Sequence, residues 1–151
     1  MKKAFPDTSF LCSIYRAQTF SAKADEYMLG LKEPLSASGL LLLEFRQSLR
    51  LQSRLFSLDG SKGFSGNEGI RMLRDLQLDL NAGVLKIEAV DWPDVHRIAE
   101  ELSHRHTPER GHRVVDLLHV ATALHLGAED FLTFDGNQKV LAEAEGMSVP
   151  V

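Results

Sequence analysis

The sequence predicts a three-layer α/β/α fold, in which helices cover both faces of a central parallel sheet of about four to five strands. Two observations carry this prediction. Short apolar segments alternate with longer segments of helical spacing, and only residues 57–69 form an interior stretch rich in glycine and serine. A length of 151 residues suits one core, so we expect residues 1–151 to form a single domain.

Several segments have the short, extended character of strands. In chain order they are residues 2–7, a brief piece after Pro34, and residues 84–90, 130–134 and 147–151. Because helical segments separate them, we expect these strands to pair in parallel through crossover connections.

The segments between the strands have the apolar spacing of helices that bury one face. In chain order they are residues 8–18, residues 22–32, a segment from a serine cap at Ser36 or Ser38 to about Leu55, and residues 67–80, 91–106, 114–126 and 136–145. Pro93 suits the first turn of its helix, and Arg97 can pair with Glu100 and Glu101 on a solvated face. Residues 106–113, HTPERGHR, are expected to form a loop.

Composition excludes several classes of protein. The net charge of −4 argues against a basic nucleic-acid-binding tail, although acids that hold divalent cations would lower the total and still serve polyanion chemistry. The single cysteine, Cys12, excludes a disulfide scaffold and suits a reducing cytoplasm. The longest apolar run, Leu40 to Leu43, is far too short to span a bilayer. We therefore expect a cytoplasmic protein without a membrane partner.

Two aspartates bracket a mostly apolar stretch, DLLHVATALHLGAEDFLTFD, from Asp116 to Asp135. With Asp116 in the first turn of a helix, the chain rises about 16 Å to Leu126. The following strand returns over about the same distance, so the two aspartates reach the same edge of the sheet. That edge holds the carboxyl ends of the strands, where ligands bind in open α/β folds. Asp7 follows the first strand and belongs to the same edge.

Glu44 is the fourth acid of interest, because no cation lies one turn away from it on its own helix. A buried glutamate without a compensating charge is costly, and a metal ion would supply that charge. Four carboxylates at one edge would also repel one another. Hard oxygen ligands without a thiol or a histidine set suit Mg²⁺ or Mn²⁺, and such a site serves phosphodiester hydrolysis.

Each acid also has a structural explanation. Asp135 and Gln138 form a capping-box pattern, Asp116 suits a helix first turn, and Asp7 suits a turn. His119, one helical turn beyond Asp116, is expected to be a satisfied, partly buried histidine. The convergence of the acids on one edge favours a site, since helix caps have no reason to share an edge with a buried glutamate. A zinc site is a weaker alternative, suggested by His104, His106 and His112.

Three blocks of the sequence resemble the PIN-domain proteins, in particular the VapC-type toxins of bacterial and archaeal toxin–antitoxin pairs. The blocks are DTSFL at Asp7, LLLLEFRQSL around Glu44, and the final RVVDLLHVATALHLGAEDFLTFDGNQKVLAEAEGMSV. The resemblance implies a PIN-like fold and a ribonuclease whose Mg²⁺ or Mn²⁺ is held by Asp7, Glu44, Asp116 and Asp135. A metal-activated water would attack an RNA phosphodiester. Ser9 matches a small hydroxyl residue near the metal in such proteins.

The resemblance also implies a cognate antitoxin whose tail covers the site, and a homodimer. Two features depart from the family pattern. Pro6 lacks the N–H of a central strand, and an acidic chain must hold RNA through local positive patches. Candidates for such patches are Arg46 and Arg50 on the Glu44 helix, and Arg105, Arg110 and Arg113.

Two other functions remain open. A non-catalytic PIN-like module would bind RNA or a protein, and its mark would be the absence of metal-dependent cleavage. Another acid-site protein would be a phosphatase with Asp7 as nucleophile, or a phospho-acceptor receiver domain. The phosphatase prefers a D-x-D start, whereas Asp7 is followed by Thr8 and Ser9. The receiver requires paired acids near the first strand, which this sequence does not have.

Overall fold

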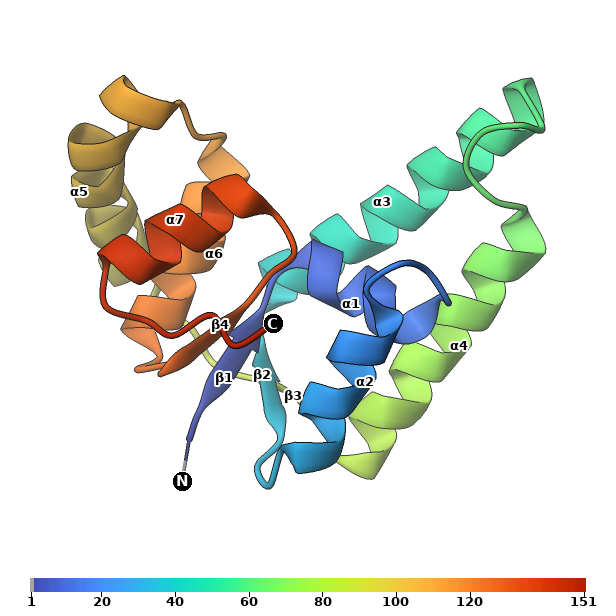
Figure 1. The fold of residues 1–151 in the computed structure, drawn as a ribbon, viewed down its shortest axis with the longest axis horizontal. Helices are drawn as coiled ribbons and strands as arrows, with labels where there is room; N and C mark the ends of the chain where they lie inside the picture. Colours follow the sequence, from blue (N-terminus) through green and yellow to red (C-terminus); the bar gives the residue numbers. More distant parts are fainter. Residues whose placement is uncertain (1) are drawn as a thin grey trace.

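A computed structural model describes residues 2–151, and within them the chain forms seven helices and four short strands. Figure 1 shows helices and strands alternating along the chain, as the sequence predicts. The strands are β1 (Ala4–Pro6), β2 (Leu35–Ala37), β3 (Leu85–Ile87) and β4 (Asp130–Leu132). The helices are α1 (Thr8–Tyr15), α2 (Ser21–Gly30), α3 (Gly39–Leu58), α4 (Gly66–Ala82), α5 (Trp92–Arg110), α6 (Val114–His125) and α7 (Gly136–Ala144).

The strands pair in parallel, which confirms the predicted topology. β1 pairs with β4, and β2 pairs with β3. β1 and β2 lie side by side in the middle without forming a hydrogen-bonded ladder. The expected terminal strand at residues 147–151 is reduced to one parallel bridge between Ser148 and Asp130. The central sheet is therefore smaller than the predicted four to five continuous strands.

Pro6 explains the interrupted ladder between β1 and β2. The Asp7 N–H donates to the Leu132 carbonyl of β4, 2.9 Å away. Successive residues of a strand face opposite neighbours, so Pro6 faces β2, where it has no N–H to donate. The position of Asp7 itself is set by its bond to β4.

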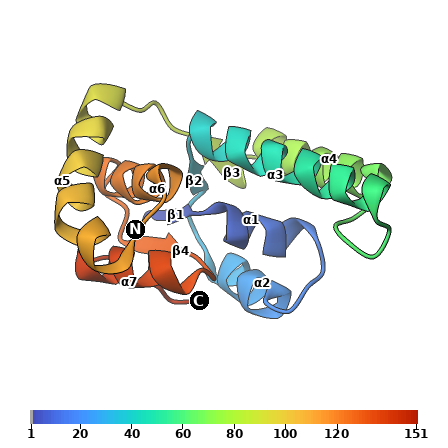
Figure 2. The same cartoon turned by 90° about the horizontal axis from the view of Figure 1, so that it is seen from above.

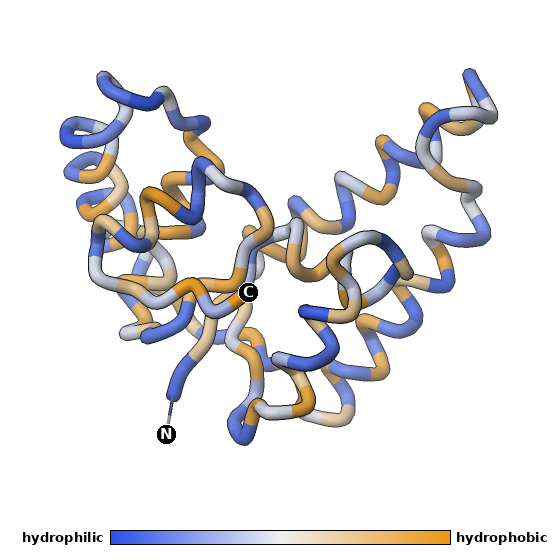
Figure 3. Tube along the Cα trace, in the orientation of Figure 1, coloured by the Kyte–Doolittle hydropathy of each residue, from blue (hydrophilic) through white to orange (hydrophobic). Residues whose placement is uncertain are grey.

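Helices cover the strands on two sides, so the predicted three layers are present. Figure 2 shows α5, α6 and α7 on one side of the strands and α1, α2, α3 and α4 on the other. The aromatic rings of Phe5 and Phe131 stack between neighbouring strands with centroids 6.4 Å apart. Figure 3 shows apolar residues along β1, β4 and α6, whereas α5 is largely hydrophilic. α6 is thus the inner helix of its layer, and seven of its residues are buried.

The prediction of a loop over residues 106–113 is wrong in its first half, because α5 continues to Arg110. Pro108 lies in the last turn of α5, where its missing N–H removes one helical hydrogen bond close to the point at which the helix ends anyway. The N–H of Gly111 then caps the helix by donating to the Thr107 carbonyl at 2.8 Å.

The glycine-rich stretch between α3 and α4 is shorter than predicted, since α4 begins at Gly66 behind an N-cap at Ser65. Gly63 in this loop has φ +62°, and a Cβ atom there would lie 2.1 Å from the Gln52 carbonyl oxygen. Only glycine allows the loop to return this closely along α3. None of the helices in residues 2–151 combines the length and the apolar character that crossing a bilayer requires.

Candidate active site

The three aspartates reach one edge of the sheet, as their spacing predicts. Asp7 follows β1 and is the N-cap of α1, and Asp135 follows β4 and is the N-cap of α7. Asp116 lies in the first turn of α6. Because β1 and β4 are parallel and in register, Pro6 opposite Leu132, the chain places Asp7 beside the residues that lead into Asp135.

Asp7 is 1% exposed, and each of its oxygens accepts two hydrogen bonds. Oδ1 accepts from the Ser9 hydroxyl at 2.6 Å and from the Phe10 amide at 3.1 Å. Oδ2 accepts from the Thr133 hydroxyl and from Gln138 Nε2, the latter at 3.0 Å. Burial raises the pKa of Asp7, and the bonds from Ser9, Thr133 and Phe10 partly oppose that rise. All four donors are neutral and Asp7 forms no ion pair within residues 2–151, although the nearby charge of His119 also lowers its pKa.

Asp116 is joined to Asp7 through a single side chain. Gln138 Nε2, which donates to Asp7, also donates to Asp116 Oδ1 at 3.2 Å. Arg113 holds Asp116 from the other side with two hydrogen bonds, Nε to Oδ2 at 3.0 Å and a terminal nitrogen to Oδ1 at 3.1 Å. This pairing with Asp116 raises the pKa of Arg113, and the charges of Glu44 and Asp135 raise it further. Arg113 therefore lies within the field of three carboxylates.

Glu44 has partners from two other helices. Its Oε1 accepts a short hydrogen bond from the Thr8 hydroxyl of α1, and it lies 3.3 Å from His119 Nε2 of α6. Burial alone would raise the pKa of Glu44, but His119, Thr8 and the charge of Arg113 together lower it. The sequence prediction that no intrahelical cation stabilises Glu44 holds. The compensating groups come from neighbouring elements.

His119 differs from its prediction. The imidazole is fully buried, at 0% exposure, and within residues 2–151 neither ring nitrogen makes an aligned hydrogen bond. Its Nε2 lies 3.3 Å from Glu44 Oε1, and its charge also lowers the pKa of Asp7. It is therefore part of the candidate site and not an independently satisfied core histidine.

Asp135 is an N-cap, as its sequence context predicts, because its Oδ1 accepts from the amides of Asn137 and Gln138, both at 2.9 Å. The capping box is not completed. The Asp135 N–H donates to the Thr133 hydroxyl at 2.9 Å, and the Gln138 side chain turns away to the other aspartates. Ser9 lies in the same network, because its hydroxyl also accepts from the Phe134 amide at 3.0 Å.

The sequence did not single out Thr8, Thr133 or Gln138 as site residues, and Arg113 was considered only as an RNA contact. Two features of the sequence could have indicated that His119 and Thr133 belong to the site. His119 lies three residues after Asp116, which places both on one face of α6. Thr133 lies directly after β4 and two residues before Asp135, and its hydroxyl reaches Asp7 at the end of β1.

The zinc alternative finds no support in the described chain. His106 pairs with Glu145 at 3.0 Å, and His112 contacts Asn137 at 3.1 Å. These two histidines thus have separate partners, and His104 is exposed.

The residues of the acidic edge fit a hard divalent cation by their chemistry, since the donor set consists of carboxylate oxygens. At this edge Gln138 Oε1 is also buried and accepts no hydrogen bond from residues 2–151. As the side chains lie, however, no three Asp, Glu, His or Cys groups of residues 2–151 are grouped closely enough to hold one ion. Asp7 already accepts four hydrogen bonds, which fills its lone pairs. A cation at Asp7 would need one of these donors to move.

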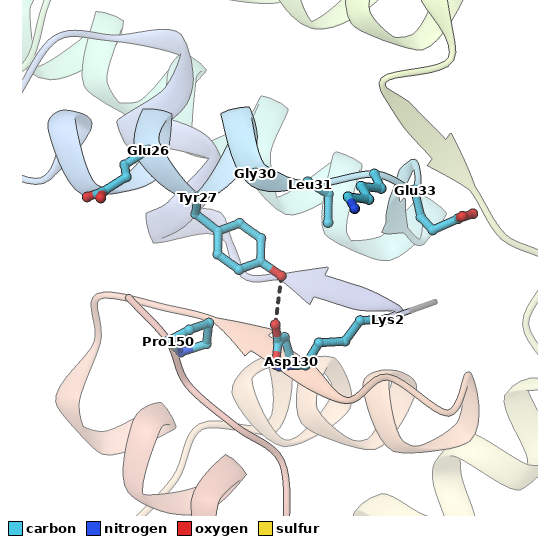
Figure 4. Close-up of a pocket in the computed structure, with 9 residues that line it drawn as sticks. Lys2, Glu26, Tyr27, Gly30, Leu31, Glu33, Asp130 and Pro150 are labelled. Atoms are coloured by element: carbon cyan, nitrogen blue, oxygen red, sulfur yellow. Dashed lines mark hydrogen bonds and ion pairs between the residues drawn. The ribbon is translucent and has the colours of Figure 1, made fainter.

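A separate pocket of about 430 Å³ lies at the opposite edge, where β1 and β4 begin. Figure 4 shows Tyr27 pointing at Asp130, with Lys2 beside the same carboxylate. Asp130 is 2% exposed, the Tyr27 hydroxyl donates to its Oδ2 at 2.8 Å, and the Lys2 ammonium forms an ion pair with Oδ1 at 2.7 Å. Burial and this hydrogen bond raise the pKa of Tyr27. This pocket is not connected with the acidic edge by any of the site contacts.

The fold and the acidic edge define a small α/β protein with carboxylates gathered at the carboxyl ends of parallel strands. The family model of the PIN domain matches residues 4–144, so this chain belongs to the PIN-domain family. Mycobacterium tuberculosis VapC20, described as a "Sarcin-Ricin loop cleaving toxin", is 20% identical, with 97% of both chains covered and a TM-score of 0.68. FitAcB from Neisseria gonorrhoeae is 17% identical, covering 97% of this chain and 95% of its own, with a TM-score of 0.62. These structures show the same fold. No curated protein matches the sequence.

Proposed function

We propose that this protein is a metal-dependent endoribonuclease, the toxin of a toxin–antitoxin pair, which hydrolyses RNA phosphodiesters. The observation that carries the proposal is the buried link from Asp7 through Gln138 to Asp116. Burying two carboxylates around one shared amide donor, with no ion pair at Asp7 within residues 2–151, opposes folding, and such costly groups are typical of functional sites. VapC20, which has the same fold, is described as a cleaving toxin.

The proposed metal ligands are Asp7, Glu44, Asp116 and Asp135. A bound Mg²⁺ or Mn²⁺ would activate water for attack on the phosphodiester and neutralise charge on the leaving oxygen. His119 and Thr8 hold Glu44 and lower its pKa, which favours the ionised carboxylate that a cation would bind.

The other residues of the site orient these acids. Ser9 and Thr133 hold Asp7 between the ends of β1 and β4. Thr133 also accepts from the Asp135 amide, so one hydroxyl connects the two aspartates that follow the paired strands. This rigid support suits a site in which the acids must keep a fixed arrangement around a cation.

The RNA backbone requires positive charge near the site, although the chain is acidic. Arg46, Arg50 and Arg54 of α3 follow one another at four-residue spacing, about 6 Å apart along the helix. Within residues 2–151 none of the three forms an ion pair. By contrast, Arg105 pairs with Glu145 and Arg113 with Asp116, and Arg110, which forms no ion pair within residues 2–151, donates to Asn137 at 3.0 Å. We therefore place the phosphate contacts on α3, which also carries Glu44.

The proposed partners are a cognate antitoxin and a second copy of the chain. Figure 1 shows α3 and α4 projecting beyond the rest of the fold. Both helices expose large apolar side chains, as expected for a surface that a protein partner covers. They are Leu43, Leu51, Leu55, Phe56 and Leu58 of α3, and Ile70 and Leu78 of α4. We propose a cytoplasmic location for the pair.

RNA cleavage by the purified chain, freed of any bound partner, tests the proposal. The wild type should cleave with Mn²⁺ or Mg²⁺ and stop with chelator, and Asp7→Asn and Asp116→Asn should be inactive. Asp130→Asn is the matched control, because it changes a buried aspartate at the opposite edge. A folded wild type that binds RNA but cleaves none of a broad panel with either metal would point to the non-catalytic PIN-like module.

A further inference from the structure

Gln138 is a buried amide between two acids. Its side chain belongs to α7, is 5% exposed, and donates from one nitrogen to Asp7 at 3.0 Å and to Asp116 at 3.2 Å. An amide nitrogen carries two hydrogens, so each carboxylate can receive one. The opposite orientation of the amide would direct its oxygen at two acceptors, which the hydrogen-bond chemistry excludes.

This position is not explained by the local structure of α7. In a capping box the glutamine side chain would return to the amide of Asp135, but Thr133 already accepts from that amide. The backbone of Gln138 takes part in the cap, and its side chain is free to turn inward. There its Oε1 is buried and accepts no hydrogen bond from residues 2–151. A side chain kept only for packing would be apolar at such a place.

The acceptors around Gln138 are nearly filled. Asp7 accepts four hydrogen bonds in total, and Asp116 Oδ1 accepts from both Gln138 and Arg113. A cation that binds both Asp7 Oδ2 and Asp116 Oδ1 must therefore replace a donor. Gln138 is the one donor that the two oxygens share, so its movement alone frees both.

We propose that Gln138 is a positioning residue that takes the place of the divalent cation between Asp7 and Asp116 and moves aside when the cation binds. The amide keeps the two carboxylates together in the cation-free protein, and it competes with the cation for them. Gln138 thereby sets the metal affinity of the site. This role rests on the proposed metal-dependent function.

The test compares Gln138→Met, which keeps the length of the side chain but has no donor, with the wild type. Gln77→Met, at an exposed glutamine of α4, is the matched control. Calorimetric titration measures Mn²⁺ affinity, and thermal unfolding is followed in chelator and in saturating Mn²⁺. Neither measurement depends on RNA cleavage.

In chelator, Gln138→Met should lower Tm by about 3–8 °C, since two buried carboxylates lose a donor. Its Mn²⁺ affinity should rise about five- to tenfold, because the competing amide is gone, and saturating Mn²⁺ should remove most of the Tm difference. Gln138→Glu, which adds a third carboxylate, should show a larger rise of Tm with Mn²⁺ than the wild type. Gln77→Met should change none of these quantities.

Equal or weaker Mn²⁺ affinity in Gln138→Met, or the same loss of Tm with and without Mn²⁺, overturns the role of Gln138. If Gln138→Met does not fold, the test rests on Gln138→Glu. A rise of Tm with Mn²⁺ in Gln138→Glu that equals that of the wild type overturns the role of Gln138. If the variants overturn the role of Gln138 but the wild type binds Mn²⁺ and cleaves RNA, the proposed function remains intact. A wild type that binds Mn²⁺ but cleaves no RNA contradicts the proposed function alone, and one that binds no Mn²⁺ overturns both.

Discussion

Two buried aspartates lie at opposite ends of the same pair of strands, and they differ in how their charge is compensated. Asp130 begins β4 and contacts the Lys2 ammonium and the Tyr27 hydroxyl. Asp7 ends β1 and contacts four neutral donors, among them Thr133 and Gln138. Both are almost fully buried.

The difference is between an acid that a lysine of the chain neutralises and an acid that forms no ion pair within residues 2–151, as the proposed metal site would require. Lys2 neutralises Asp130 from within the chain, and together with Tyr27 it joins the amino-terminal segment and α2 to β4. No cation of residues 2–151 contacts Asp7, and burial raises the pKa of its carboxyl group. A buried carboxylate that is hydrogen-bonded but not neutralised can bind a metal ion without first losing an ion pair.

The largest expected difference between the two aspartates is in catalysis. Asp7→Asn should reduce metal-dependent RNA cleavage about a thousandfold or more, because it removes a charge that the cation needs. Asp130→Asn should keep a rate close to that of the wild type, at a temperature at which both variants are folded. Cleavage rates on one RNA substrate measure both effects. Equal losses in the two variants would contradict the separation of the two clusters.

The next effect concerns the stability of the Asp130 cluster. Tyr27→Phe should lower the free energy of unfolding by about 2 kcal/mol, because a buried carboxylate loses a hydrogen bond. Denaturant titration should show the same loss in chelator and in Mn²⁺. If Mn²⁺ restored the free energy of unfolding of Tyr27→Phe to that of the wild type, the Asp130 cluster would also respond to the metal.

The pH dependence of stability distinguishes Asp7 by its sign. Burial raises its pKa in the folded protein above its ordinary value of 3.8, so folding favours the protonated acid. The stabilisation that protonated Asp7 provides is therefore fully present below about pH 3.8, and it is lost as the pH rises through the pKa of Asp7 in the folded protein. Asp7→Asn lacks this loss, so in chelator the Tm of the wild type relative to that of the variant should fall by a few degrees between acidic and neutral pH.

The control for this pH effect is the same pair of proteins at acidic pH and in Mn²⁺. The Tm of the wild type relative to that of Asp7→Asn should recover as the pH falls toward about 3.8, because protonated Asp7 and asparagine are then both neutral. Saturating Mn²⁺ at neutral pH should also raise it, since only the wild type gains the cation. A Tm difference that does not change with pH would contradict the burial of an uncompensated charge.

The smallest expected effect is that of Lys2, whose side chain is 54% exposed in its ion pair with Asp130. Solvent and salt weaken such pairs, so Lys2→Ala should change Tm less than Tyr27→Phe does, and high salt should diminish the difference. Thermal unfolding at low and high salt measures it. A larger loss than that of Tyr27→Phe would mean that Lys2, and not Tyr27, is the main support of Asp130.

Much of the fold could be predicted because it depends on local pattern. The alternation of short apolar segments with helical spacing indicated parallel strands, and element lengths indicated that Asp7, Asp116 and Asp135 meet at one edge. The loop assigned to residues 106–113 failed because proline usually ends a helix, whereas Pro108 lies where α5 is already ending. The sheet is smaller than predicted because Pro6 interrupts the ladder toward β2.

The sequence by itself determined the fold class, the order of the elements and the edge at which the aspartates lie, since spacing and element length decide where each turn falls. Only the tertiary structure decided the partners of the acids: Gln138 between Asp7 and Asp116, and His119 and Thr8 at Glu44. These partners come from elements distant in the sequence. The direction of a side chain depends on which donors its neighbours have already used, and no local pattern contains that information.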